Sequence, residues 1–160
     1  MAFSVLSLSG CDKKNEKLTF EQQIQKRSHT IKLLEERFGA QLLDCNTIQS
    51  VNKVVILDTL ILGIRKEADD FIIRAKINNN CRKKYYTELK CSKEIAEQFN
   101  QTKSNCNILA ARIDKMYDYK LIAETDSLSG ENPQLDLGNS VLLTGECLAL
   151  MEVPAIINAN

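Results

Sequence analysis

The stretch of sequence that decides the fold is YYTELKCSKEIAEQFNQ, residues 85–101. Its first half, Tyr85 to Cys91, is predicted to form a strand. Its second half, Lys93 to Gln101, is predicted to form a short helix, because the Ser92 side chain can accept a hydrogen bond from an amide that the helix start leaves unpaired. The side of this helix that is expected to be buried consists of Ile95, Ala96 and Phe99.

Two further strands are predicted before this stretch. Residues Val54 to Ile64 are rich in β-branched and other aliphatic side chains, a composition typical of strands, and Gly63 is placed for a bulge or a bend. The polar residues 65–70 are predicted to form a turn, and Phe71 to Ile77 the next strand. Asn78 to Asn80 are predicted to form a second turn, because asparagine tolerates positive φ.

After the short helix, the pattern predicts strands again. Asn107 to Met116 and Tyr119 to Glu124 are predicted as a strand pair, and a loop rich in Ser, Gly, Asn and Pro covers Ser127 to Gln134. Val141 to Leu150 is predicted as the last strand. The tail from Pro154 onward is expected to be frayed.

The predicted order is therefore three strands, one short helix, and two or three further strands. This is the order of an OB-type barrel, in which the helix closes one end of the barrel between the third and fourth strands. The predicted fold class is α+β, mainly β. Residues 46–153 are expected to form a small OB-like barrel of five or six strands, with an N-terminal amphipathic helix packed on it.

That N-terminal helix is predicted over residues 19–39. Thr19 and Gln22 have the spacing of a capping box, in which each side chain satisfies a backbone donor at the helix start. Gly39 is placed where a left-handed residue ends a helix. The apolar residues that recur near a 3.6-residue period, and that are expected to form the buried face, are Phe20, Ile24, Ile31, Leu34 and Phe38.

Two short segments resemble a known family of domains. Leu89-Lys90-Cys91 leads into a helix, and residues 138–147 read GNSVLLTGEC. Together they resemble the tRNA-anti-like OB domains of bacterial envelope proteins, where a glycine-bounded strand ending in Gly-x-Cys recurs. The chain departs from that pattern in its long 65–70 turn and its extra cysteines. The resemblance implies that the third strand lies beside the last one, which makes Cys91 and Cys147 the first candidates for a disulfide. The alternative is that these two cysteines lie on different faces and stay reduced.

The N-terminus carries a second resemblance. Leu8-Ser9-Gly10-Cys11 is followed by the polar residues 12–17, DKKNEK, and resembles the lipobox of bacterial lipoproteins. The resemblance implies lipidation of Cys11, removal of residues 1–10 as a signal-peptide remnant, and a polar tether over residues 11–18. Residues 1–10 contain no Lys or Arg, whereas a secretory signal normally begins with positive charge. Either the true start lies upstream, or this segment is only an apolar tail. Asp12 resembles the signal that retains lipoproteins in the inner membrane.

Composition sets broad limits. A chain of 160 residues with 44% hydrophobic residues is long and apolar enough for one domain with a core. Lys plus Arg and Asp plus Glu both number 21, so the chain has no net field to attract nucleic acid or anionic lipid. If Cys11 carries lipid, the remaining cysteines can form two disulfides and leave one thiol in an oxidising compartment, or several can simply be small buried residues. These are Cys45, Cys81, Cys91, Cys106 and Cys147.

No catalytic or metal-binding pattern is found in the sequence. His29 is the only histidine. It has no Cys, Asp or Glu at ligand spacing, and a solvated or half-packed role on the first helix is expected for it. The sequence has no Cys-x-x-Cys motif, glycine-rich phosphate loop or Gly-x-Ser-x-Gly elbow. We therefore expect no enzyme activity, no catalytic residues, no cofactor and no metal, and no small-molecule ligand can be inferred.

The candidate binding face consists of Arg82, Lys84, Tyr85 and Tyr86, which combine bases and aromatics on the predicted third strand. Such a mixture can bind single-stranded nucleic acid by stacking and charge, but the neutral chain argues against nucleic acid. The expected function is that of a lipid-anchored envelope protein that presents the barrel to the periplasm and binds an envelope or secreted protein. One alternative is a cytosolic module that binds single-stranded nucleic acid. Another is an immunity or inhibitor lipoprotein that acts against a toxin or a lysozyme.

Overall fold

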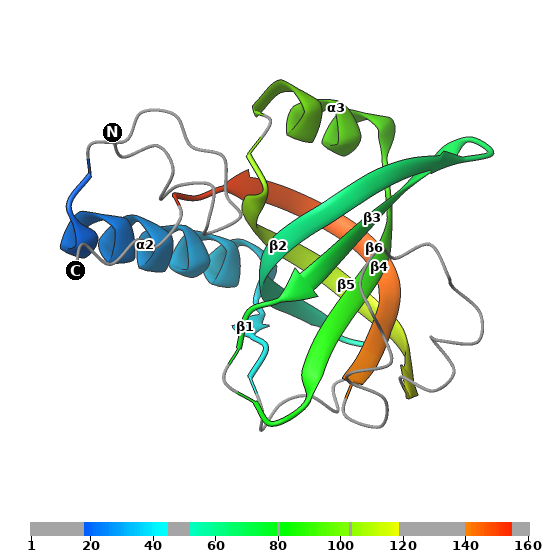
Figure 1. Ribbon diagram of the computed structural model, residues 1–160, viewed down its shortest axis with the longest axis horizontal. Coiled ribbons are helices and arrows are strands. Elements are labelled where there is room, and N and C mark those ends of the chain that lie inside the picture. The colour runs from blue at the N-terminus through cyan, green and yellow to red at the C-terminus, as the bar shows by residue number, and fades with distance from the viewer. Residues whose placement is uncertain (1–17, 45–51, 80, 103, 119–139, 155–160) are drawn as a thin grey trace.

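The computed structural model describes residues 18–44, 52–79, 81–102, 104–118 and 140–154. In these residues five long strands wrap into a barrel, with one helix against its side and one at its end (Figure 1). The elements in chain order are α2 (Phe20–Phe38), β1 (Gln41–Leu42), β2 (Val54–Glu67), β3 (Asp70–Ile77), β4 (Lys84–Cys91), α3 (Lys93–Thr102), β5 (Cys106–Asp118) and β6 (Ser140–Glu152).

The barrel closes in the order β2–β3–β4–β6–β5, and β5 returns to pair with β2. β4 and β6 run parallel, with Lys84 opposite Ser140 and Lys90 opposite Glu146. The other pairings within the barrel are antiparallel, and the short β1 adds to β2 in parallel. The predicted α+β, mainly β fold with an OB-like barrel is confirmed.

Side chains alternate between the two faces of each strand, and the inward-facing ones fill the barrel with apolar groups. Each strand contributes at least one fully buried residue to this interior, as expected for strands with one face in a core. Examples from the five strands in spatial order are Leu57, Ile73, Leu89, Leu143 and Leu109.

Helix α3 covers one end of the barrel, as predicted (Figure 1). Ile95 and Phe99 pack against the barrel core, and the Gln98 side-chain amide donates to the carbonyl of Leu150 on β6 at 2.9 Å. The cap is also as predicted, because the backbone N–H of Ile95 donates to the hydroxyl oxygen of Ser92 at 3.2 Å.

Helix α2 packs on the outside of the barrel and forms a second apolar cluster with the outward-facing residues of β2, β5 and β6. The predicted capping box at Thr19 and Gln22 is present, and Gly39 ends the helix with φ of 59°. The buried residues of this cluster are Leu34, Ile56, Cys106, Ile108, Ala110, Ala149 and Val153.

The apolar face predicted for this helix is wrong in its first turns. Phe20 and Ile24 are exposed, whereas Gln23 and Thr30 are buried in line with Leu34. Burial of these polar side chains is tolerated because they are hydrogen-bonded. The Gln23 amide donates to the carbonyl of Leu18 at 3.1 Å, and the Thr30 hydroxyl donates to the carbonyl of Lys26 at 3.0 Å.

The turn predicted over residues 65–70 is also wrong. β2 continues to Glu67, which pairs with Asp70 at the start of β3, so only Ala68 and Asp69 form the turn. Ala68 has φ of 56°, the sign that a tight hairpin turn requires. The polar residues 65–67 look like a loop in the sequence because this end of the hairpin projects from the barrel (Figure 1). The bulge predicted at Gly63 is present as a register shift between Ile61 and Gly63.

The other sequence predictions fall partly inside the described residues. β5 and β6 contain the predicted strands 107–116 and 141–150 and extend beyond them. The carbonyl of Pro154, predicted to begin a frayed tail, accepts a hydrogen bond from Arg27 at 2.9 Å. The predicted strand 119–124, the loop 127–134 and the N-terminal residues 1–17 lie outside the described residues.

Gly145 lies where two strands come unusually close. A β-carbon on Gly145 of β6 would overlap with the carbonyl oxygen of Arg112 on β5 and would lie 2.9 Å from the Cα of Ile113. Real β-carbons do not come that close to backbone, and a backbone neighbour cannot swing away. The glycine of the Gly-x-Cys segment is therefore required by the packing of β6 on β5.

We expect Gly145→Ala to lower the free energy of unfolding by about 2–4 kcal/mol, because the two strands must separate to admit a methyl group. The matched control is Gly63→Ala on β2, where a β-carbon would meet nothing within 4 Å, and where we expect a change within about 0.5 kcal/mol. Urea unfolding followed by circular dichroism measures both. Equal effects of the two substitutions would contradict the close approach of β5 to Gly145.

Candidate functional site

The outer face of β3 and β4 is the candidate binding surface. Residues Ile73, Ala75, Tyr85 and Leu89 point into the barrel, so the residues between them point outward. In OB-type barrels the face of the second and third strands, together with the adjoining loops, binds the ligand, and β3 and β4 are the second and third strands of this barrel. We call this surface the β3–β4 outer face, and define it by Ile72, Arg74, Lys76, Tyr86, Glu88 and Lys90.

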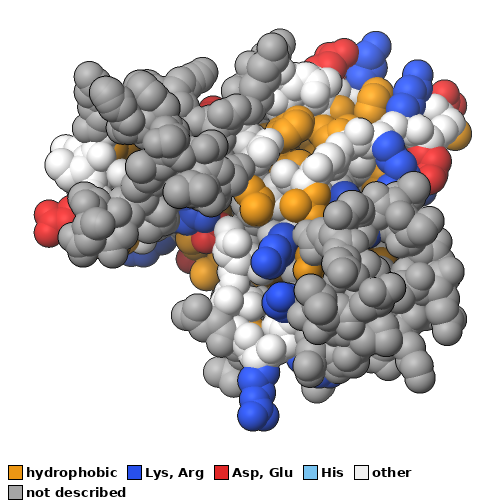
Figure 2. Space-filling view, viewed as in Figure 1, with side chains coloured by type: hydrophobic (Ala, Val, Ile, Leu, Met, Phe, Trp, Pro, Cys, Tyr) orange, Lys and Arg blue, Asp and Glu red, His pale blue; other side chains and the backbone are white. Residues whose placement is uncertain are grey.

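Charges of both signs are paired on this face. Glu88 lies 3.7 Å from Arg74 and 3.8 Å from Arg65, which projects from the end of β2. Lys90 lies 3.7 Å from Asp70. Figure 2 shows basic and acidic side chains mixed at the end of the molecule where the β2–β3 hairpin projects. The Arg74 and Glu88 side chains are only 12% and 18% exposed, whereas the pair of Lys90 with Asp70 is exposed and adds little stability. Together these pairs give the surface an alternating pattern of charge.

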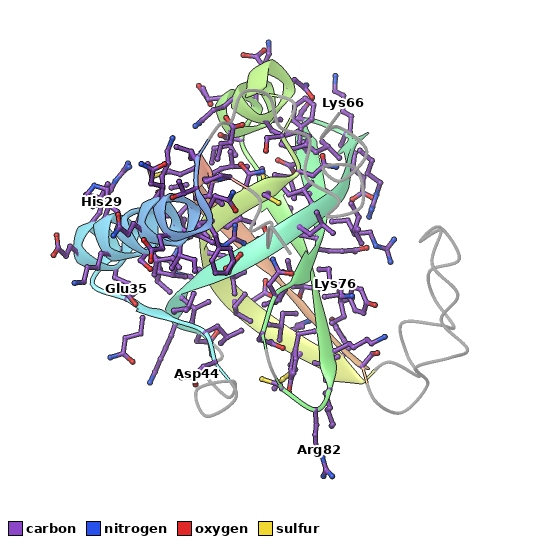
Figure 3. All side chains as sticks on the ribbon, turned by 60° about the vertical axis from the view of Figure 1, so that its left-hand side comes forward. His29, Glu35, Asp44, Lys66, Lys76 and Arg82 are labelled. Carbon is purple, nitrogen blue, oxygen red and sulfur yellow. The ribbon has the colours of Figure 1, made fainter. Side chains whose placement is uncertain are left out.

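The sequence-predicted face of Arg82, Lys84, Tyr85 and Tyr86 does not form one surface. Arg82 and Lys84 are exposed, and Figure 3 shows Arg82 at the tip of the β3–β4 connection, away from Lys76. Tyr85 is 8% exposed inside the barrel, and Tyr86 is 6% exposed on the outside, where it packs against Leu142. Neighbouring residues of a strand point to opposite sides, so the two tyrosines cannot share a contact surface.

Burial also affects the chemistry of Tyr85. Removal of its phenol from solvent raises the pKa of Tyr85 above its usual value, because burial disfavours the charged form. Tyr85 is therefore a neutral core residue at physiological pH. Of the four predicted residues, only the two basic ones are exposed.

The disulfide predicted between Cys91 and Cys147 is not present in the structure. Both are buried in the barrel core and both are free thiols. A hydrogen bond joins the two side chains and, together with burial, raises the pKa of Cys147 well above its usual value. Each thiol also donates to a carbonyl oxygen of its own strand. The Cys91 sulfur lies 3.5 Å from the carbonyl oxygen of Leu89, and the Cys147 sulfur lies 3.6 Å from that of Ala149.

Sequence reasoning missed the ion pair that holds α2 on the barrel. The Arg27 guanidinium donates to both carboxylate oxygens of Asp58 on β2, with Nε at 3.2 Å from Oδ2. Asn78 also donates to Asp58 at 3.2 Å, and Arg27 donates to the carbonyl of Pro154. The available signal was Asp58 itself, the one charged residue in the apolar run from Val54 to Ile64. A charge in such a position needs a partner.

His29 and the other charged groups in the described part of the chain form no metal-binding arrangement. Figure 3 shows His29 on α2, and its side chain is exposed, in agreement with the solvated role expected for it. The described residues contain no group of three or more His, Cys, Asp or Glu that could hold a metal ion. Neither helix of the described segments is both long enough and apolar enough to span a membrane. Cys11 and Cys45 lie outside the described residues.

Comparison of the chain with protein families, with curated proteins and with solved structures finds no match.

We expect Asp58→Ala to lower the free energy of unfolding by about 2–3 kcal/mol, because it leaves the Arg27 side chain, 12% exposed, without its carboxylate. The control is Glu67→Ala, whose carboxylate is 62% exposed and lies 3.6 Å from Arg65. That pair is worth less than about 1 kcal/mol. Urea unfolding compares the two variants, and an equally small effect of Asp58→Ala would show that Arg27 does not hold α2 in place.

Proposed function

We propose that the chain is a lipid-anchored protein of the bacterial cell envelope, and that its OB-like barrel acts by binding a protein partner on the β3–β4 outer face rather than by catalysis. The observation that carries the location is the lipobox-like segment Leu8-Ser9-Gly10-Cys11, followed by a polar segment. The barrel follows as a self-contained binding unit. Two or more acyl chains hold a protein stably on a membrane, whereas one is marginal.

The length of the polar segment limits how far the barrel can lie from the proposed anchor. A chain extends by at most about 3.6 Å per residue, so the residues between Cys11 and the helix cap at Thr19 reach no further than about 30 Å. The proposed anchor therefore keeps α2 and the barrel within that distance of the lipid surface, where envelope and secreted proteins are accessible.

The charge pattern of the outer face supports a protein partner over nucleic acid. Glu88 lies between Arg74 and Arg65 and offsets the positive charge that phosphates need. Tyr86, the aromatic residue on this face, is covered, although single-strand binders stack bases on exposed rings. Alternating charge is suited to complementary pairing with another protein surface, where it sets specificity.

The anchor is tested by expressing the gene in its bacterial host. We expect the protein in the membrane fraction, with an intact mass that corresponds to an acylated chain beginning at Cys11. Cys11→Ser removes the acyl acceptor and is expected to abolish the modification, while Cys45→Ser is expected to leave it intact. An unmodified, uncleaved wild-type protein in the soluble fraction would contradict the proposed anchor.

The binding surface is tested by photo-crosslinking in cells. A photoreactive residue at Lys76, on the outer face, is expected to give a discrete protein adduct that resists nuclease. The same residue at Lys32, exposed on α2, is expected to give none. Mass spectrometry of the adduct then separates an envelope partner from a toxin or a lysozyme. A nuclease-sensitive adduct, or equal adducts from both positions, would contradict a protein partner on this face.

Binding to single-stranded oligonucleotides provides an independent check. Fluorescence anisotropy at physiological salt is expected to give a dissociation constant of about 10⁻⁴ M or weaker, which is the weak end of non-specific binding. Micromolar binding that is lost in Lys76→Glu would favour a nucleic-acid module instead.

A further inference from the structure

The two free thiols, Cys91 and Cys147, occupy neighbouring positions on the two parallel strands. Lys90 of β4 pairs with Glu146 of β6, and the next residue on each strand is a cysteine. Because both strands run in the same direction, Cys91 and Cys147 lie side by side, and their side chains point into the same core. Cys106, in contrast, is buried in the other apolar cluster, under α2.

The spacing of neighbouring strands is compatible with a disulfide at this point. Neighbouring strands lie about 4.8 Å apart, and disulfides join residues whose Cα atoms are about 4.4–6.8 Å apart. The two thiols interact with each other, and each also donates to a carbonyl oxygen of its own strand. Formation of a bond between the sulfurs therefore requires the side chains to rotate away from those carbonyls.

We propose that Cys91 and Cys147 form a redox modification site, at which thiol–disulfide exchange with a disulfide donor produces a bond that joins β4 to β6. The donor is a glutathione-type or protein disulfide. Use of the site in the cell rests on the proposed envelope location, where such donors are abundant. The geometry of the site does not depend on that location.

The exchange balances in two steps. The Cys91 thiolate attacks one sulfur of the donor, so the donor disulfide breaks, a mixed disulfide forms, and the released donor thiolate takes up a proton. The Cys147 thiolate then attacks the Cys91 sulfur and releases the second donor thiol. Two protons and two electrons pass from the cysteine pair to the donor, which is reduced to two thiols.

The closed barrel slows this exchange. Both sulfurs are buried, and a donor can reach them only when β6 is not paired with β4. The bond is therefore expected to form while the chain folds, and to form slowly in the native protein. β6 is the last strand of the barrel along the chain, so the disulfide would link this C-terminal strand to β4, the third strand of the barrel.

The test compares refolding of the full chain in a glutathione/glutathione-disulfide buffer with refolding in dithiothreitol. After alkylation of free thiols and digestion with trypsin, Cys91 is released in the peptide 91–93 and Cys147 in the C-terminal peptide that begins at residue 121. We expect these two peptides to be linked, with a mass about 2 Da below their sum. The thermal midpoint of the oxidised wild-type protein is expected to lie about 10 °C above that of oxidised Cys91→Ser, a comparison that leaves the disulfides of Cys81 and Cys106 intact in both proteins.

Variants and a cellular measurement complete the test. Cys91→Ser and Cys147→Ser are each expected to lose the linked peptide and the rise in midpoint, while Cys45→Ser is expected to keep the linked peptide. Folded wild-type protein in which both thiols are alkylated after oxidative refolding would overturn the site. If the bond forms in vitro but both thiols are alkylated after trapping in cells, the site is retained and the proposed oxidising location is contradicted.

Discussion

The parallel pairing of β4 with β6 is the constraint on which the rest of the structure depends. Parallel neighbours cannot be joined by a tight turn, so the chain must leave β4 through α3, cross as β5, and return as β6. That route places α3 over the end of the barrel and closes the barrel between β5 and β2. It also places Gly145 against the backbone of β5 and Cys147 beside Cys91.

Two different interactions then define the outside of the barrel. On one side, the Arg27–Asp58 ion pair and an apolar cluster hold α2. On the β3–β4 outer face, Glu88 pairs with the exposed Arg65 from the end of β2, and the exposed Lys90 pairs with Asp70. An anchor at Cys11 and a partner on the outer face would therefore engage different parts of the molecule, so the domain could be tethered and bound at the same time.

The order of strands and helices could be predicted from the sequence because it depends on local signals, such as the Ser92 cap, the capping box at Thr19 and the bulge at Gly63. Side-chain placement was harder to predict. Gln23 is buried in place of Phe20, and its side-chain amide is satisfied by a local hydrogen bond to the carbonyl of Leu18 that hydrophobic periodicity does not reveal. The residues predicted as one binding face do not share a surface, because strand alternation separates Tyr85 from Tyr86. Asp58 had a visible signal, but its partner lies far away in sequence.

The direction of β6 relative to β4 can be measured by nuclear Overhauser spectroscopy of the isotope-labelled protein. A parallel pair predicts backbone contacts between residues near Lys84 and Ser140 at one end, and between residues near Lys90 and Glu146 at the other. The same spectra should contain contacts between β2 and β5 that close the barrel. Cross-peaks that instead join Lys84 to Glu146 and Lys90 to Ser140 would reverse β6, separate Cys91 from Cys147, and contradict the OB-like barrel.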